Sequence, residues 1–239
     1  MYRWPVDTIQ AHMDAPVQHF GPEDVAQVFG NARLGQSLID FLTPLYANFN
    51  GATFFEGAFR ILPIEGFEDH GFPLLVDWNN PKGWKRFEDA KANDTFYFGS
   101  NGYGDLFGIP ISPEREILAD RIGIYWVERY EYQEAGLQWQ AFFPRMFETA
   151  DYANFFARLE QYRWAAAQRG KPAPWQCFSS NVPAVLGGQT TIDNIGIQSL
   201  AVHVSFTSQL LQQWKEGKLT PGQPLAMVDL YDQQGNLIR

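Results

Sequence analysis

The acidic side chains best placed to do chemistry lie between residues 56 and 105, close in sequence to several tryptophans. The carboxylates are Glu56, Glu65, Glu68, Asp69, Asp77 and Asp105, and the tryptophans are Trp78, Trp84 and Trp126. Two carboxyl groups about 5 to 9 Å apart across a sugar-binding cleft can hydrolyse a glycosidic bond. The sequence places no acid within reach of another, and tryptophans in strands usually belong to the core. A carbohydrate-active enzyme is therefore only an alternative, and we predict that the chain is not an enzyme.

A second candidate for chemistry is the glycine-rich stretch FYFGSNGYGDLFGIPIS, which spans residues 96–112. A dinucleotide-binding loop has the pattern Gly-x-Gly-x-x-Gly between a strand and a helix. Gly102 and Gly104 fit the first two positions, but Gly108 comes one residue too late, and a strand-like segment follows it. We therefore predict a hairpin with a turn at Asn101-Gly102, in which glycines supply positive φ angles.

Side chains for several other chemistries are isolated or missing. The four histidines, at 12, 19, 70 and 203, lack zinc-ligand spacing, and no Gly-x-Ser-x-Gly nucleophile motif occurs. We expect His203 to be a strand residue with a satisfied ring. The single cysteine, Cys177, excludes an intrachain disulfide and is expected to be a small core residue. No cofactor, metal ligand or catalytic residue is predicted.

Composition favours a folded, acidic protein. The 239 residues are 45% hydrophobic, and 27 acidic residues against 18 basic ones give a net charge of -9. This charge disfavours direct binding of nucleic acid, suits a basic protein partner and also aids solubility. No apolar stretch is long enough for a membrane span and the first residues lack an apolar leader, so we expect a cytoplasmic protein.

The spacing of apolar residues predicts helices and strands in a mixed order. Helical spacing predicts helices at residues 21–30, 34–51, 149–170 and 207–217. Short aromatic or branched segments predict strands at residues 58–64, 73–78, 95–99, 105–111, 121–130, 199–204 and 225–232. This order predicts an α+β fold, with a curved, mostly antiparallel sheet flanked by helices. We place one domain at residues 1–170 and expect residues 171–239 to be a strand-helix-strand extension packed on the same core.

The order of these signals resembles that of the SUKH superfamily, over roughly residues 20–170. The shared pattern is a helix ending in Asn-Gly, a strand before proline, an FG…GD hairpin and a late helix with paired phenylalanines. The matching positions are Asn50, Gly51, Ile61, Leu62, Pro63, Phe98, Gly99, Gly104, Asp105, Phe155 and Phe156. The resemblance implies an α+β fold and, in bacteria, an immunity protein that binds a cognate toxin, often a nuclease, without chemistry. The extension at 171–239 departs from the pattern of small family members.

The leading hypothesis is therefore a binding protein that occludes a toxin. Partner contacts in this superfamily vary, so the candidate binding residues come from turns and charge: Glu65, Glu68, Asp69, Asn101, Tyr103 and Asp105, all expected to be exposed. Aromatic residues often anchor interfaces, and acidic residues would speed capture of a basic toxin. The alternative of another class is a regulatory or scaffold module that binds a host protein.

Overall fold

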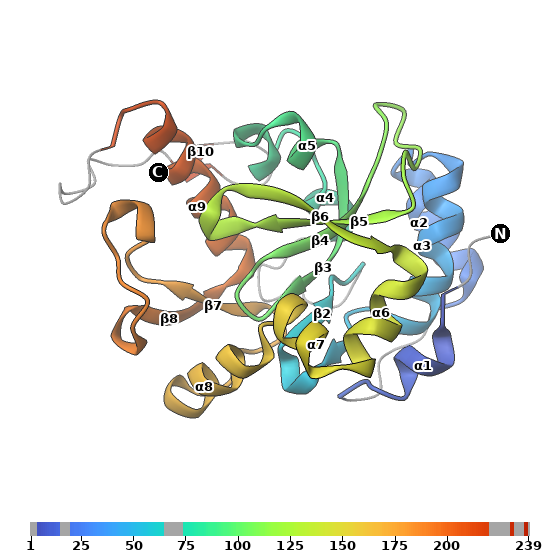
Figure 1. Cartoon of the computed structure of the whole chain (residues 1–239). Coiled ribbons are helices and arrows are strands. Elements are labelled where there is room, and N and C mark those ends of the chain that lie inside the picture. The colour runs from blue at the N-terminus through green and yellow to red at the C-terminus, as the bar shows by residue number, and fades with distance from the viewer. Residues whose placement is uncertain (1–3, 15–19, 65–73, 220–229, 232–236, 239) are drawn as a thin grey trace.

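One open, six-stranded sheet organises the fold (Figure 1). The computed structural model describes residues 4–14, 20–64, 74–219, 230–231 and 237–238. The strands follow one another in chain order and every pairing is antiparallel: β1 (Thr53–Phe54), β2 (Phe59–Ile61), β3 (Thr95–Asn101), β4 (Leu106–Pro110), β5 (Arg121–Trp126) and β6 (Glu131–Gln138). With helices packed against this sheet, the predicted α+β class is confirmed.

One face of the sheet packs on helices from both halves of the chain. These are α1 (Val6–Gln10), α3 (Gln36–Phe49), α6 (Trp139–Glu148) and α7 (Ala150–Phe156), with α2 (Pro22–Asn31) against α3. Phe98 on β3 meets Phe41 on α3, with ring centroids 6.3 Å apart. Phe107 on β4 meets Phe142 on α6 at 5.6 Å. Aromatic burial on this face accounts for a large part of the core.

The opposite face is covered by shorter elements and by the last long helix. The short elements are α4 (Leu75–Trp78), the 3-10 turn η3 (Trp84–Phe87) and α5 (Ala90–Asn93), and α9 (Leu200–Lys215) packs beside η3. The ring centroid of Trp84 lies 5.6 Å from that of Tyr97 and 5.9 Å from that of Tyr125, and both tyrosines are on the sheet. Since both faces are covered, all seven residues of β3 are buried, which explains its continuous rather than alternating apolar pattern.

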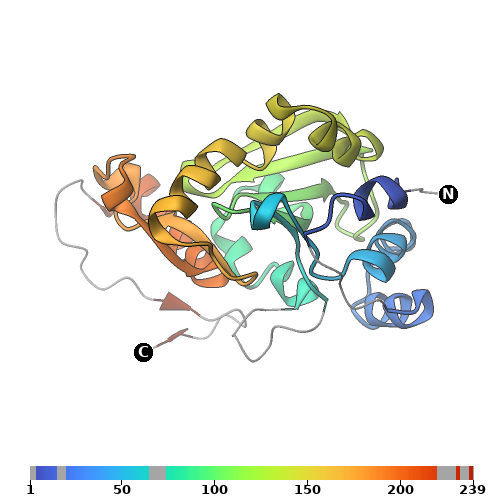
Figure 2. The same ribbon diagram turned by 90° about the horizontal axis from the view of Figure 1, so that it is seen from below.

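The C-terminal elements pack on the same core. After α8 (Leu159–Arg169), β7 (Gln176–Ser180) and β8 (Ile195–Ser199) form an antiparallel hairpin that leads into α9. The short strands β9 (Leu230–Tyr231) and β10 (Leu237–Ile238) pair with each other. Cys177, Phe178 and Val204 belong to the core cluster that also contains the sheet. In both Figure 1 and Figure 2, β7, β8 and α9 lie at the end of the molecule opposite α1, α2 and α3.

Several local predictions were wrong. The predicted strand at 73–78 forms α4 over Leu75–Trp78, and the predicted strand at 199–204 opens α9. The alternation at 199–204 is short, whereas burial continues at helical spacing through Val204, Ser208 and Leu211. The helix predicted at 149–170 is broken between α7 and α8 at Arg158, whose φ is +51°. Helix α6 and strands β6, β7 and β8 were not predicted.

The glycine-rich segment forms the expected hairpin. Strands β3 and β4 flank a turn in which Gly104 has φ +82°, so the predicted strand-turn-strand structure is confirmed. The turn is tightly packed because a Cβ atom at Gly104 would lie 2.5 Å from Cδ2 of His203 on α9. His203 is thus a buried helix residue, not a strand residue, and contacts the hairpin.

We predict that Gly104→Ala lowers the free energy of unfolding by about 2–4 kcal/mol, because alanine is strained at this φ and overlaps the buried His203 ring. Urea denaturation measures the loss. Gly136→Ala is the matched control, since Gly136 has φ +70° with nothing within 4 Å of an added Cβ, and it should lose only about 1 kcal/mol. Equal losses would contradict the close packing of the hairpin on α9.

Candidate functional site

The structure buries the part of the predicted binding surface that it describes. Asn101, Tyr103 and Asp105 are only 0%, 6% and 3% exposed, so their expected exposure was wrong. The reason is that helices α7, α8 and α9 close over the hairpin, which turn statistics alone do not reveal. Glu65, Glu68 and Asp69 lie outside the described residues. A partner-binding role for the six residues stays a prediction.

Asn101 organises the turn from within. Its Oδ1 accepts hydrogen bonds from the backbone N–H groups of Tyr103, at 3.0 Å, and Asp105, at 3.1 Å. Its Nδ2 donates to Asp105 Oδ2 at 2.9 Å and to the carbonyl of Phe156 at 3.1 Å. An asparagine that bonds its own following backbone stabilises a turn, so this side chain has a local structural role.

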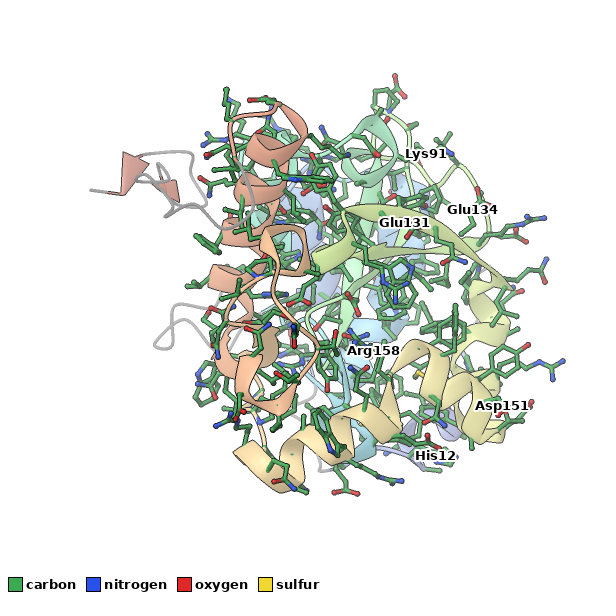
Figure 3. The ribbon with its side chains drawn as sticks, turned by 60° about the vertical axis from the view of Figure 1, so that its left-hand side comes forward. His12, Lys91, Glu131, Glu134, Asp151 and Arg158 are labelled. Atoms are coloured by element: carbon green, nitrogen blue, oxygen red, sulfur yellow. The ribbon has the colours of Figure 1, made fainter. Side chains whose placement is uncertain are left out.

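Asp105 connects that turn to two other parts of the chain. Its Oδ1 accepts from the backbone N–H of Val127 at 3.2 Å, and its Oδ2 lies 3.4 Å from Nη1 of Arg158. The Arg158 guanidinium also stacks 4.0 Å from the ring centroid of Tyr103. Burial raises the pKa of Asp105, while Arg158 and Asn101 act to lower it. Figure 3 places Arg158 at the junction of α7 and α8, apart from Glu131 and Glu134 on β6.

The tryptophans considered for a sugar-binding cleft belong to the core. Trp78, Trp84 and Trp126 are all buried. These tryptophans are therefore not available to line a sugar-binding cleft. Within the described ranges, no group of three or more His, Cys, Asp and Glu side chains could hold a metal ion. No helix in the same ranges is long and apolar enough to cross a bilayer.

An open cavity lies elsewhere, between the start of the sheet and the segment after α8. Its volume is about 280 Å³, and its lining residues are Asp14, Thr53, Glu56, Gly57, Arg60, Lys171, Pro172, Ala173 and Pro174. Arg60 on β2 is 3% exposed. Glu56 forms two ion pairs: its Oε2 lies 2.8 Å from Nζ of Lys171, and its Oε1 lies 3.6 Å from Nε of Arg163. Sequence reasoning missed this site. A charged residue inside the apolar run AFRILPI was the available signal.

Two titratable side chains, the buried Lys85 on η3 and the partly buried Glu88 directly after it, lie against the second face of the sheet. Lys85 donates from Nζ to the carbonyls of Asn93, at 3.0 Å, and Thr95, and burial lowers its pKa to about 7. Glu88 accepts a hydrogen bond from the hydroxyl of Tyr125, and burial raises its pKa to about 7. Neither group lines the cavity, so we assign Lys85 to the packing of η3 and α5 on the sheet, and Glu88 to the packing of α9 on the same face.

We predict that Asp105→Asn lowers the free energy of unfolding by about 2–3 kcal/mol. The new amide group would oppose the donors of Asn101 and Arg158 and leave a partly buried guanidinium without its counter-charge. Glu148→Gln is the control, because it removes a carboxylate from the exposed Arg145–Glu148 pair and should change stability little. Urea denaturation compares the two. A small effect of Asp105→Asn would show that the buried pair does not hold this junction.

The stability of the protein should depend on pH through Glu88. Its folded pKa of about 7 exceeds the unfolded value of about 4.3, so the folded state binds more protons between these values. The free energy of unfolding should therefore fall as pH rises from about 4.3 to 7, by on the order of 1–3 kcal/mol from this group. Glu88→Gln should remove that decline in urea titrations, whereas Glu131→Gln on the exposed β6 should retain it. An unchanged decline in Glu88→Gln would contradict this assignment.

The comparisons with known proteins point to the C-terminal half of the chain. Residues 138–211 match the family model described as "T6SS immunity protein Tdi1, C-terminal". The matched segment runs from the start of α6 through most of α9, which is less than half of the chain. No curated protein sequence matches the chain.

A solved structure extends the similarity in fold to most of the chain. The match, titled "Crystal structure of Atu4351 from Agrobacterium tumefaciens", is 13% identical, with a TM-score of 0.51. The alignment covers 87% of this chain and 89% of that one. At this identity the likeness concerns the fold alone. The sequence similarity of α6 to α9 to an immunity-protein family is therefore the finding that bears on function.

Proposed function

We propose that this chain is an immunity protein that binds and neutralises a toxin delivered by a T6SS. The match of residues 138–211 to a T6SS immunity-protein family carries the proposal. Membership of the SUKH superfamily, which the order of motifs suggested, is part of the same proposal. A binding role needs no reaction centre, in keeping with a hairpin whose polar side chains bond to one another.

Exposed apolar side chains indicate where a partner would bind. In the described part of the chain, six large apolar residues are well exposed, and four of them lie within residues 138–211: Phe155, Trp164, Val182 and Val202. Phe155 and Trp164 flank the junction of α7 and α8 that Arg158 fixes to Asp105. We propose that Asn101, Tyr103 and Asp105 serve partner binding indirectly, by holding this junction, and that Phe155 and Trp164 make the contacts.

Charge would assist the same encounter. The net charge of -9 would attract a basic toxin, and electrostatic attraction raises association rates more than it raises affinity. Neutralisation would follow from occlusion of the toxin's working surface, and a nuclease is the toxin class we favour. Binding in the cytoplasm would intercept such a toxin before it reaches nucleic acid.

Co-expression with a candidate T6SS toxin, sought first among the neighbouring genes, tests the proposal. We expect the wild-type protein to restore growth and to form a complex that is measurable by calorimetry. Trp164→Ala should weaken the complex about fivefold or more, because truncation of a central aromatic contact typically costs over about 1 kcal/mol. Leu118→Ala is the matched control, since Leu118 is 65% exposed and lies outside residues 138–211.

The outcomes separate the hypotheses. Failure to protect, together with capture of a host protein whose complex Trp164→Ala disrupts, would replace the immunity role with a regulatory or scaffold role. Protection with equal affinities for wild type, Trp164→Ala and Leu118→Ala would support the immunity role but contradict the proposed contact surface. Circular dichroism of each variant confirms that loss of binding is not loss of folding.

A further inference from the structure

Arg60 is a buried cation that forms no ion pair with any described residue. It lies on β2 between Phe59 and Ile61, and its Nη1 donates to the backbone carbonyls of Pro174 and Gln176. None of the ion pairs found within the described ranges involves Arg60, and its buried Nε has no hydrogen-bond acceptor there. Burial of a guanidinium is unfavourable unless a counter-charge and further hydrogen bonds compensate it. Within the described ranges, the guanidinium therefore has a buried donor without an acceptor and a positive charge without a counter-charge.

The cavity that Arg60 lines has room for an anion. Its volume of about 280 Å³ is several times the roughly 30 Å³ that a water molecule occupies in the liquid. Lys171 lines the cavity with a half-exposed side chain, whereas Pro172, Ala173 and Pro174 provide a largely apolar lining. The cavity thus combines two cationic groups with an apolar surface.

The two acids in the cavity are already engaged. Both carboxylate oxygens of Asp14 accept backbone hydrogen bonds, from the N–H groups of Glu56 and Gly57, each at 2.8 Å. Glu56 pairs with Lys171 and with Arg163. Phe55 and Glu56 both adopt positive φ, of +56° and +62°, which is a strained conformation for residues with a side chain. The hydrogen bonds to Asp14 fix this turn, and neither acid supplies an acceptor to Arg60.

We propose that this cavity binds a carboxylate monoanion carrying a short apolar chain. The carboxylate compensates the charge of the Arg60 guanidinium, which lines the cavity, and accepts from Nζ of Lys171, which has three donor hydrogens and can serve Glu56 as well. The apolar chain lies against Pro172, Ala173 and Pro174. A phosphate dianion fits less well, because Asp14 and Glu56 line the same space and would repel the second charge.

The same chemistry has two sources. A free short-chain carboxylic acid offers it, and so does the C-terminal carboxylate of a peptide ending in a small apolar residue. The test therefore uses butyrate and its neutral isostere butyramide for the first source. Acetyl-Ala-Ala-Val with a free C-terminus, and the same peptide as an amide, serve for the second.

The experiment follows the Nε–H resonance of Arg60 in ¹⁵N–¹H spectra of the full chain at constant ionic strength. Butyrate should shift this resonance in a saturable manner, and butyramide should not. Lys171→Gln should weaken butyrate binding about two- to fivefold, as expected for loss of an exposed ionic contact. Arg163→Gln is the matched control, since Arg163 also pairs with Glu56 but does not line the cavity, and its affinity should stay at the wild-type value.

Each outcome decides a part of the proposal. The proposal would be overturned if butyrate gave no response, or if butyramide gave an equal one. It would also be overturned if both variants weakened binding equally, or if inorganic phosphate bound as tightly as butyrate or more tightly. Binding of the free-acid peptide but not of its amide would assign the site to a protein chain end. Binding of butyrate with exclusion of the peptide would assign it to a small molecule. No toxin is needed, so this result is independent of the proposed immunity function.

Discussion

The fold depends on one buried carboxylate that satisfies groups from three separate parts of the chain. Asp105 accepts from Asn101 in its own turn, from the backbone of Val127 after β5 and from Arg158 between α7 and α8. A buried carboxylate is stable only while these donors are present. Asp105 therefore joins the hairpin, the end of β5 and the break between two helices, and the exposed side chains of Phe155 and Trp164 lie on those two helices.

A second set of contacts joins the C-terminal hairpin to the same turn. The N–H of Gly102 donates to the carbonyl of Ala58, and the N–H of Phe178 on β7 donates to the carbonyl of Gly102, at 2.7 and 2.8 Å. Arg60 adds hydrogen bonds from β2 to the segment before β7. The segment that resembles an immunity-protein family is thus held by the sheet that precedes it, and a contact surface on α7 and α8 would inherit the rigidity of that sheet.

Sequence reasoning succeeded where the determining interactions are local. The β3–β4 hairpin follows from aromatic strands and an Asn-Gly turn, and both signals lie within about fifteen residues. It failed where distant residues decide. Asp105 is buried beneath α7, α8 and α9, and the cavity at Arg60 is lined by residues 171–174, so neither could be read from neighbouring residues. At 199–204 a six-residue alternation suggested a strand, but buried residues at helical spacing extend to Leu211, and the segment forms the start of helix α9.

If the protein acts by binding alone, affinity and association rate have different origins in this structure. Exposed apolar side chains on a fixed helix junction lose little conformational freedom on binding, so most of their contact energy would appear as affinity. The acidic surface acts over a longer range and would mainly raise the association rate, with a strong dependence on salt. Substitutions in the two sets of residues should therefore alter different rate constants. The buried network at Asp105 would then contribute to affinity indirectly, through the positions of α7 and α8.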